Sequence, residues 1–386
     1  MISIGIDGNE ANVDSRVGIG QYAFQVLSSI NKLVTSDKKN YRDVHIEVFL
    51  KKPPKPDLPN KSSIWKYTVF GPQPFWTQVA LPAHLVLHRD NDVFFSPSHY
   101  APRFSPCPSV VSIMDLSFLT FPELFTKKDL LQLNRWTMYS VNRASHIFTI
   151  SEFSKNEIIA KYRIPNNLIT VTYPGFNREL FKPEKVQQDV KVKEKYGLNK
   201  PYVLFVGTLQ PRKNLIRLIQ AINILKHKNI NILLVVVGKK GWLYEEIFKE
   251  VDVLKLKNQI RFCDYVDDSE LASLYRGASC FVLPSLYEGF GIPVVEAMAS
   301  GCPVIVGNTS SLPEVVGDSA QTVDAHNSEK IASKIAEIYN NDTVRKTLIQ
   351  KGLKRAQLFD WNRCAEKTLE VLMSVAAPKN KYDSSH

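Results

Sequence analysis

The sequence predicts an α/β protein with two domains, each built on a parallel β-sheet that helices cover on both faces. Short apolar runs that suit buried strands alternate with segments whose apolar residues recur at helical spacing, and this alternation is typical of parallel sheets. The chain has 386 residues, which is more than one compact core usually holds. Apolar residues become sparse and charges frequent between Lys182 and Lys200, and we expect the domain boundary there.

The first predicted domain, residues 1–183, opens with a strand over residues 2–6. A loop that ends in Gly18-Ile-Gly20 leads into an amphipathic helix. The predicted buried face of this helix consists of Ala23, Val26, Leu27, Ile30 and Val34. Further strands are expected at 46–50, 93–95, 110–114 and 147–150, and proline-rich loops separate several of them.

The second predicted domain, residues 184–358, starts a new α/β series with a strand at 202–206. The loop 207–214 follows it, and then a helix with a predicted apolar face of Leu215, Leu218, Ile219, Ile222 and Leu225. The remaining strands are expected at 231–237, 260–263, 280–283 and 304–306. Asp268-Ser269 is expected to cap the helix that leads to Ala278.

The most informative segment is Glu288-Gly-Phe-Gly-Ile-Pro-Val-Val-Glu296, between the predicted strand 280–283 and a predicted helix. Pro293 suits the first helical position, and Gly301 suits the end of the helix. Unpaired backbone N–H groups at a helix start can hold an anion, and two nearby carboxylates can accept hydrogen bonds from ligand hydroxyls. A nucleotide sugar combines phosphates with hydroxyls and fits both features. The alternative is that the two glutamates only line a loop and complement the helix dipole.

The run from Pro284 to Ile305 resembles, nearly position for position, the E-x7-E motif of retaining glycosyltransferases of family 4, also called group 1. The resemblance covers nearly the whole chain and is strongest over residues 203–323. It implies the GT-B fold, an α/β fold of two Rossmann-like domains that face each other across a cleft. It places residues 1–183 on the acceptor side and the nucleotide-sugar site in residues 184–358. Residues 359–386 would form a helix that returns to the first domain, followed by a polar tail.

The resemblance also implies roles for individual residues. Arg212 and Lys213 would bind the donor diphosphate, Glu288 would face the transferred sugar, and Glu296 would accept hydrogen bonds from the ribose hydroxyls. Further donor contacts are implied for Gly18, Gly20, Gly289, Phe290, Gly291, Ser310, Ser311 and Leu312. Taken alone, a basic pair also suits a solvated loop, and Gly-Ile-Gly also suits a plain turn.

One position departs from the family pattern. Members often carry His-Asp-Leu at the end of a strand in the first domain, where this chain has Met114-Asp115-Leu116. A methionine cannot form the hydrogen bonds of an imidazole. Asp115 remains a catalytic candidate, with the alternative that its carboxylate only satisfies local backbone groups. His99 is a candidate replacement for the family histidine that is missing at position 114.

The activity implied is transfer of a hexose, with mannose as the leading sugar, from a nucleoside diphosphate sugar to an acceptor hydroxyl of an envelope glycan or glycolipid. Glu288, Arg212, Lys213 and Asp115 are the predicted catalytic residues. We expect no metal and no cofactor, because fixed positive groups can stabilise the leaving diphosphate and no metal-binding motif accompanies them. The alternatives are a phosphorylase or a sucrose- or trehalose-type synthase of the same fold, a nicotinamide oxidoreductase, and a non-catalytic scaffold that binds nucleotide sugars.

The net charge of +11 suggests an anionic partner. Basic residues are in excess between Lys32 and Lys66, beside Trp65 and Tyr67, and this favours an anionic membrane surface, with an ordinary solvated loop as the equal alternative. Nucleic acid is not expected, because no motif for it accompanies the charge. Apolar runs are too short to span a bilayer and the start does not resemble a signal peptide, so the predicted location is the cytoplasm or the inner face of the cytoplasmic membrane.

Overall fold

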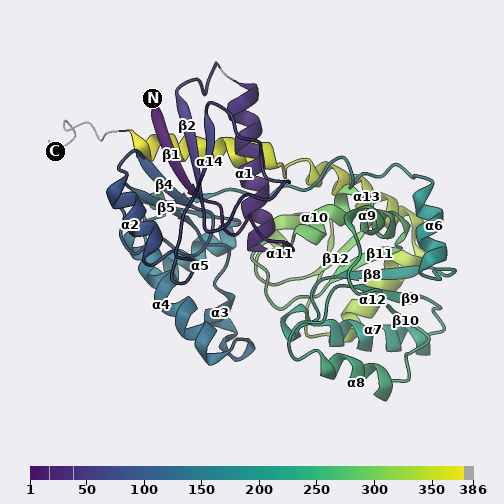
Figure 1. The fold of residues 1–386 in the computed structure, drawn as a ribbon. Coiled ribbons are helices and arrows are strands. Elements are labelled where there is room, and N and C mark those ends of the chain that lie inside the picture. Colours follow the sequence, from purple (N-terminus) through teal and green to yellow (C-terminus); the bar gives the residue numbers. More distant parts are fainter. Residues whose placement is uncertain (17, 38, 378–386) are drawn as a thin grey trace, which may run out of the picture. The chain divides into compact units, whose positions relative to one another are not determined.

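The computed structural model describes residues 1–16, 18–37 and 39–377, and the predicted polar tail at 379–386 lies outside these ranges. The chain folds into two compact α/β units (Figure 1). Unit 1 comprises Met1–Gly175 and the chain from Asp360 onward, and unit 2 comprises Phe176–Phe359. The fold class predicted from the sequence, two Rossmann-like domains, is confirmed.

The described residues of unit 1 form a parallel seven-stranded sheet in the order β3-β2-β1-β4-β5-β6-β7. The strands are β1 (Ile2–Asp7), β2 (Val44–Leu50), β3 (Trp65–Val69), β4 (Val93–Ser96), β5 (Ser109–Ser112), β6 (His146–Thr149) and β7 (Ile169–Val171). β5 ends before Met114, where a strand end was predicted, because the Met114 N–H donates to the His99 side chain instead. β3 and β7 were not predicted, because neither contains the continuous apolar run used to recognise strands.

The helices of unit 1 are α1 (Ile19–Ser36), α2 (Ala80–Leu87), α3 (Ser117–Thr120), α4 (Lys127–Arg143), α5 (Glu152–Tyr162) and α14 (Trp361–Ala376), with short 3-10 turns at Pro122–Leu124 and Asn166–Leu168. The predicted apolar face of α1 is buried at every position. The last helix, α14, packs against α1, and the Trp361 ring lies 6.0 Å from the Tyr22 ring (Figure 1). The C-terminal helix therefore completes the core of unit 1.

The described residues of unit 2 form a parallel six-stranded sheet in the order β10-β9-β8-β11-β12-β13. The strands are β8 (Tyr202–Val206), β9 (Leu233–Val237), β10 (Ile260–Phe262), β11 (Cys280–Leu283), β12 (Val304–Gly307) and β13 (Gln321–Val323). The helices are α6 (Gln188–Lys195), α7 (Leu215–His227), α8 (Glu245–Val253), α9 (Asp268–Gly277), α10 (Ile292–Ala299), α11 (Leu312–Val316), α12 (Ser328–Asn340) and α13 (Asp342–Ala356). The predicted apolar face of α7 is buried.

The cap of α9 lies one residue before the predicted one. Asp267 occupies the N-cap, and its carboxylate accepts hydrogen bonds from the backbone N–H groups of Ser269 and Glu270, both at 3.0 Å. Three consecutive polar residues of the types that cap helices begin at Asp267, so the sequence alone did not distinguish them.

The strand order reverses once in each sheet, between β1 and β4 in unit 1 and between β8 and β11 in unit 2. Because crossovers between parallel strands are right-handed, helices on either side of the reversal lie on opposite faces of the sheet. The loops that leave the two central strands then diverge at the carboxyl edge, and open α/β sheets bind ligands in that crevice.

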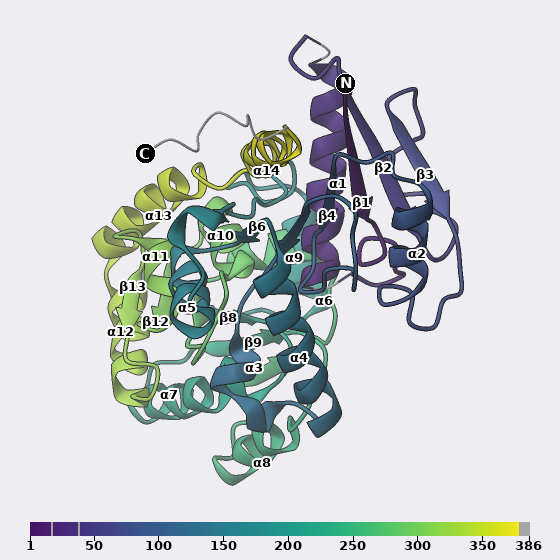
Figure 2. The same cartoon turned by 90° about the vertical axis from the view of Figure 1, so that its left-hand side faces the viewer.

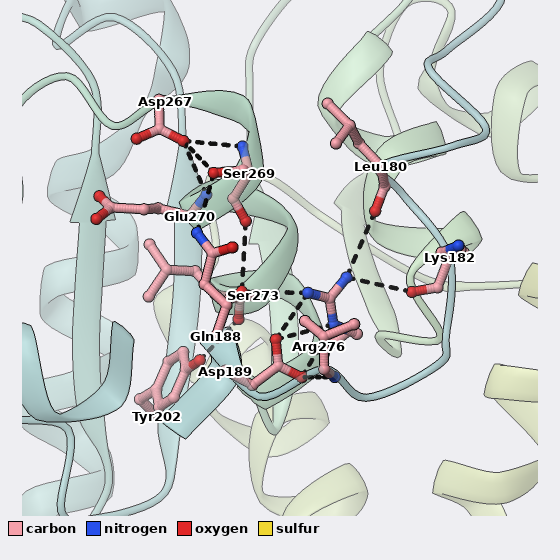
Figure 3. A network of polar contacts seen from close by, with 12 residues as sticks. Leu180, Lys182, Gln188, Asp189, Tyr202, Asp267, Ser269, Glu270, Ser273 and Arg276 are labelled. Atoms are coloured by element: carbon pink, nitrogen blue, oxygen red, sulfur yellow. Dashed lines mark hydrogen bonds and ion pairs between the residues drawn. The ribbon is translucent and has the colours of Figure 1, made fainter. Parts of the chain in front are cut away.

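Arg276 of α9 holds the start of unit 2 in place (Figure 3). Its guanidinium forms a buried ion pair with Asp189 of α6 at 2.7 Å, and its Nη1 lies 3.4 Å from the carbonyl oxygens of Leu180 and Lys182. These contacts bind the chain before α6 to unit 2. They explain why Leu180 and Lys182 belong to unit 2, which begins at Phe176, before the predicted boundary at residue 183.

The basic segment of unit 1 differs from the surface that the sequence suggested. The Trp65 side chain is fully buried in β3, so it cannot insert into a membrane interface. Lys55 pairs with Asp14, and Lys66 lies 3.2 Å from the Glu47 carboxylate. Two lysines of the segment that suggested a membrane surface are thus already paired.

Candidate functional site

Two loops of unit 2 meet where the strand order reverses. The loop after β8 contains a short 3-10 helix, Pro211–Lys213, which carries Arg212 and Lys213. The loop after the neighbouring strand β11 carries Glu288. The structure therefore brings together three residues that the sequence analysis selected for the diphosphate and the sugar, at the edge where ligands are expected.

The three side chains form one cluster. Lys213 Nζ lies 2.6 Å from Glu288 Oε1, and Arg212 Nη1 lies 3.4 Å from Glu288 Oε2. Arg212 Nη1 also donates to the Tyr287 carbonyl oxygen at 2.5 Å. The side chains of Arg212, Lys213 and Glu288 are only 16%, 14% and 7% exposed. Two cations and one carboxylate are thus held almost out of solvent.

The Glu288 carboxyl is ionised in this cluster. Burial alone would raise its pKa, but the charges of Lys213 and Arg212 and a hydrogen bond from Ser285 Oγ at 2.7 Å lower the pKa of Glu288 below its ordinary value. With Glu288 negative and both basic side chains positive, the cluster has an excess of one positive charge. A buried positive excess attracts an anionic ligand group.

Hydrogen bonds from Asn214 to two other loops fix the position of the basic pair. Asn214, directly after Lys213, donates to the carbonyl oxygens of Pro284 at 2.9 Å and Ala325 at 2.7 Å. Its φ of 57° lies in the left-handed region, which asparagine tolerates better than most residues. Neither Asn214 nor Ser285 was predicted as a site residue from the sequence. Their position in the sequence could have identified them, because both are small polar residues within a few positions of the charged residues of the cluster.

The loop after β12 holds the backbone at Glu288 by hydrogen bonds. The Glu288 N–H donates to Ser310 Oγ at 2.8 Å, and Ser311 Oγ donates to the carbonyl oxygens of Glu288 at 2.9 Å and Phe290 at 3.2 Å. Leu312 is fully buried. We therefore interpret Ser311 and Leu312, predicted as donor contacts, as residues that position the Glu288 loop.

The glycine-rich turn between Glu288 and α10 presents backbone to the site. Phe290 is 3% exposed and its ring packs 5.3 Å from the Phe359 ring, so only its backbone can reach a ligand. Gly289 is also buried, and Gly291 has a φ of 100°, which glycine adopts without strain. α10 begins at Ile292, so Pro293 holds its second position, one later than predicted.

Glu296 lies on α10, and among the residues that the structure describes no basic side chain pairs with it as Arg212 and Lys213 do with Glu288. Tyr275 of α9 donates to Glu296 Oε2 at 3.3 Å. Burial, reinforced by the nearby Asp268 carboxyl, raises the pKa of Glu296 to about 8. At neutral pH this carboxyl is therefore mostly protonated and offers one donor and one acceptor.

This protonation predicts a pH-dependent effect of Glu296→Gln on nucleotide affinity. At pH 6.5 glutamine resembles the neutral carboxyl, and we expect nearly equal Kd values for a nucleoside diphosphate. In the ribose-binding role that the family resemblance implies for Glu296, the wild-type carboxylate would accept stronger hydrogen bonds above its pKa of about 8, so the variant should then bind roughly five- to tenfold more weakly. Calorimetric titrations from pH 6 to 9 measure this ratio, and taking the ratio cancels the ionisation of the nucleotide itself.

Stability gives an independent check on Glu296. A pKa raised from 4.5 to about 8 means that the folded protein binds more protons than the unfolded chain between these values. The contribution of Glu296 to the free energy of unfolding should fall as the pH rises through that window, and Glu296→Gln should remove this dependence. A Kd ratio that stays constant from pH 6 to 9 would contradict a titrating Glu296 at the ribose.

The two predicted glycines of unit 1 lie at the start of α1. Gly18 occupies the N-cap with a φ of 52°, and a side chain there would meet nothing within 4 Å. Gly20 is buried, and an added Cβ would lie 3.0 Å from the Glu10 carbonyl oxygen. This helix start follows β1, one of the two strands at the reversal in unit 1. Gly18 and Gly20 thus lie at the ligand-binding edge of their own sheet.

Asp115 and His99 also lie at the carboxyl edge of the unit 1 sheet, after β5 and β4. Asp115 Oδ1 accepts from the Ser117 N–H at 2.9 Å, so the carboxylate satisfies a local backbone group as the alternative reading expected. His99 is 6% exposed, and its Nε2 accepts from the Met114 N–H at 3.1 Å. Burial lowers the pKa of His99 although Asp115 opposes this, so the ring is neutral with its proton on Nδ1. The candidate replacement for the missing histidine therefore contacts the backbone of Met114.

Comparison with known proteins establishes the family. Residues 186–355 match the family described as glycosyl transferases group 1. The chain is 33% identical over 281 residues to O-antigen chain mannosyltransferase B of Escherichia coli, an alignment that covers 72% of this chain and 73% of that protein. It is 27% identical over 297 residues to the O-antigen chain mannosyltransferase RfbU of Salmonella typhimurium, covering 74% and 77% of the two chains.

Solved structures share the fold at low identity. A sucrose-phosphate synthase from Thermosynechococcus elongatus superposes with a TM-score of 0.73 at 18% identity, covering 97% of this chain and 99% of that one. HepE from Anabaena, solved in complex with UDP and glucose, gives a TM-score of 0.72 at 20% identity, covering 97% and 100%. The two Rossmann-like domains define a GT-B glycosyltransferase fold. Within that class, the chain belongs to the group 1 glycosyltransferases.

None of the helices formed by the described residues is long and apolar enough to cross a membrane.

Proposed function

We propose that this glycosyltransferase transfers mannose from GDP-mannose to a hydroxyl group of an envelope glycan or glycolipid, with retention of the anomeric configuration. The proposal goes beyond the family in naming the donor, the stereochemistry and the class of acceptor.

The observation that carries the proposal is the buried cluster of Arg212, Lys213 and Glu288. When the glycosidic bond of the donor breaks, negative charge develops on the departing diphosphate. Fixed positive groups in a water-poor site stabilise this charge more in the transition state than in the ground state. Arg212 can contact two phosphate oxygens and Lys213 can act as a compact charge, while the start of α10 adds backbone N–H groups beside them.

The proposed sugar rests on the relatives. Two of the similar proteins are named as O-antigen chain mannosyltransferases. The HepE structure contains UDP, so the fold also accommodates a uridine donor, and the base and sugar have to be tested together.

The proposed reaction balances without a further reactant. The bond between the sugar C1 and the donor phosphate oxygen breaks, and a new bond forms between C1 and the acceptor oxygen on the same face. The acceptor proton passes to the departing diphosphate, whose oxygen lies on that face. Glu288 would stabilise the positive charge that develops at C1, and Arg212 and Lys213 would stabilise the leaving group.

The first test is donor selection. We expect GDP and GDP-mannose to raise the Tm of the protein more than UDP and UDP-glucose, because a ligand that binds only the folded state stabilises it. Incubation with GDP-mannose and a mannoside acceptor should then yield an α-linked product, identified by the C1–H1 coupling constant in NMR. A larger shift with uridine nucleotides would overturn the proposed donor, and a β-linked product would overturn retention.

The same assay separates the alternatives. A non-catalytic scaffold would bind the donor without releasing GDP, and a phosphorylase would require orthophosphate. We expect GDP release in phosphate-free buffer and undiminished rates in the presence of EDTA.

A further inference from the structure

Helix α4 of unit 1 carries an unusual outer surface. Leu131 and Met138 are 56% and 51% exposed, although both are large apolar side chains. Exposed Lys127, Lys128 and Arg135 share their side of the helix, because all five positions fall within about one third of the helical circumference at 100° per residue. We call these five residues the α4 stripe; Figure 2 shows the helix beside α3.

The apolar residues of the stripe are not needed for the core of unit 1. Leu130 and Leu133, on another side of α4, already pack against buried residues such as Val111 and Val141. Leu131 and Met138 therefore add exposed apolar area to a helix whose inner face is complete. Covering such apolar area with another apolar surface is favourable in water.

All charged residues of the stripe are positive. Within the described residues, Lys127, Lys128 and Arg135 form no ion pair with a carboxylate. The only acidic residue of α4, Asp129, lies on another side of the helix, where Thr126 Oγ1 donates to its carboxylate at 2.7 Å. The stripe thus combines free cations with apolar side chains.

The neighbouring loop extends this surface. Phe104 is 56% exposed, and the preceding Arg103 lies over the Tyr139 ring of α4 at 4.6 Å. Tyr139 also donates a hydrogen bond to the Arg103 carbonyl oxygen, which fixes the loop against the helix. An exposed aromatic side chain and a further cation therefore lie next to the stripe.

We propose that the α4 stripe docks this enzyme on an anionic lipid bilayer. Lysine and arginine attract anionic headgroups, and a basic helix with apolar side chains on the same face inserts those side chains at the interface. Another protein could cover the apolar side chains equally well. The charged residues of the stripe are all positive, however, and this favours a surface with many negative groups. The basic segment at 51–66 lacks this combination, since its Trp65 is buried. The docking proposal does not depend on which donor the enzyme uses.

Vesicle sedimentation with the full chain tests the proposal. We expect wild-type protein to bind vesicles of phosphatidylglycerol and phosphatidylethanolamine, to bind phosphatidylcholine vesicles poorly, and to dissociate in high salt. The triple variant Lys127→Gln, Lys128→Gln, Arg135→Gln should lose roughly tenfold or more in partition coefficient. The double variant Leu131→Gln, Met138→Gln should also lose binding, although its charge is unchanged.

The matched control removes three lysines elsewhere on unit 1, as Lys51→Gln, Lys52→Gln, Lys61→Gln. An equal loss of vesicle binding in this control would mean that net charge alone drives binding, and it would overturn the proposed docking role of the α4 stripe. Wild-type protein that does not bind anionic vesicles, or a lipid-free dimer that the stripe variants dissociate in light scattering, would also overturn it. The Tm shift with GDP should survive in every variant, which separates failure of docking from failure of the donor site.

Discussion

Lys213→Ala and Arg212→Ala should each lower kcat/KM about a hundredfold, because each removes a cation that we assign to the leaving diphosphate. Losing one such contact costs on the order of 3 kcal/mol of transition-state stabilisation. The geometry supports this magnitude, since both side chains are more than four-fifths buried and act in a site with little competing water. Most of the loss should appear in kcat, because the diphosphate gains charge as the bond breaks. Steady-state kinetics with GDP-mannose measures both constants.

A matched control separates catalysis from stability. Lys351 of unit 2 also contacts a carboxylate, since its Nζ lies 2.8 Å from Asp318, but both side chains are exposed. Lys351→Ala removes this contact. This variant should keep wild-type turnover. Lys213→Arg should recover part of the activity, because it restores the charge with different geometry. Near-native kcat in both alanine variants would remove the diphosphate assignment.

The fold could be predicted because strands of a buried parallel sheet are apolar along their whole length. β8, β9 and β11 are such runs, and their helices show one apolar side each. β3, with the sequence Trp-Lys-Tyr-Thr-Val, lies at the sheet edge and is buried only at Trp65, so composition did not distinguish it from a loop. The Arg276–Asp189 pair could not be anticipated either, because its partners are far apart in the sequence and only the fold brings them together.

The residues of the site were predictable as types, but their interactions were not. Arg212, Lys213 and Glu288 were selected from their motifs, and the structure adds that the carboxylate lies between both cations. The difference between the two glutamates depends on what surrounds each one. Glu288 is ionised beside two cations, whereas Glu296 is neutral beside a tyrosine and a carboxyl. A seven-residue spacing contains no information about these environments.

Glu288→Gln should reduce turnover strongly without weakening the binding of GDP. The change raises the net charge of the cluster of Arg212, Lys213 and residue 288 from +1 to +2. The anionic nucleotide should therefore bind equally well or more tightly. Turnover should fall on the order of a hundredfold, since the variant lacks the carboxylate that contacts both cations and that we propose faces the developing charge at C1. The free energy of unfolding should fall by about 3 kcal/mol, because two buried cations lose their partner. Kinetics, calorimetry and urea unfolding give these three quantities.

The pH dependence of stability shows whether charge is the cause. Because the pKa of Glu288 is lowered from 4.5 in the folded protein, its contribution to stability is present above pH 4.5 and disappears as the pH falls through the folded value. The stability difference between wild type and Glu288→Gln should therefore shrink in acid. Glu337→Gln, which breaks a half-exposed contact to Lys334 at 2.8 Å, should change little at any pH. A Glu288→Gln variant that loses GDP affinity in proportion to turnover would show that the carboxylate serves binding, and that the cations alone carry the chemistry.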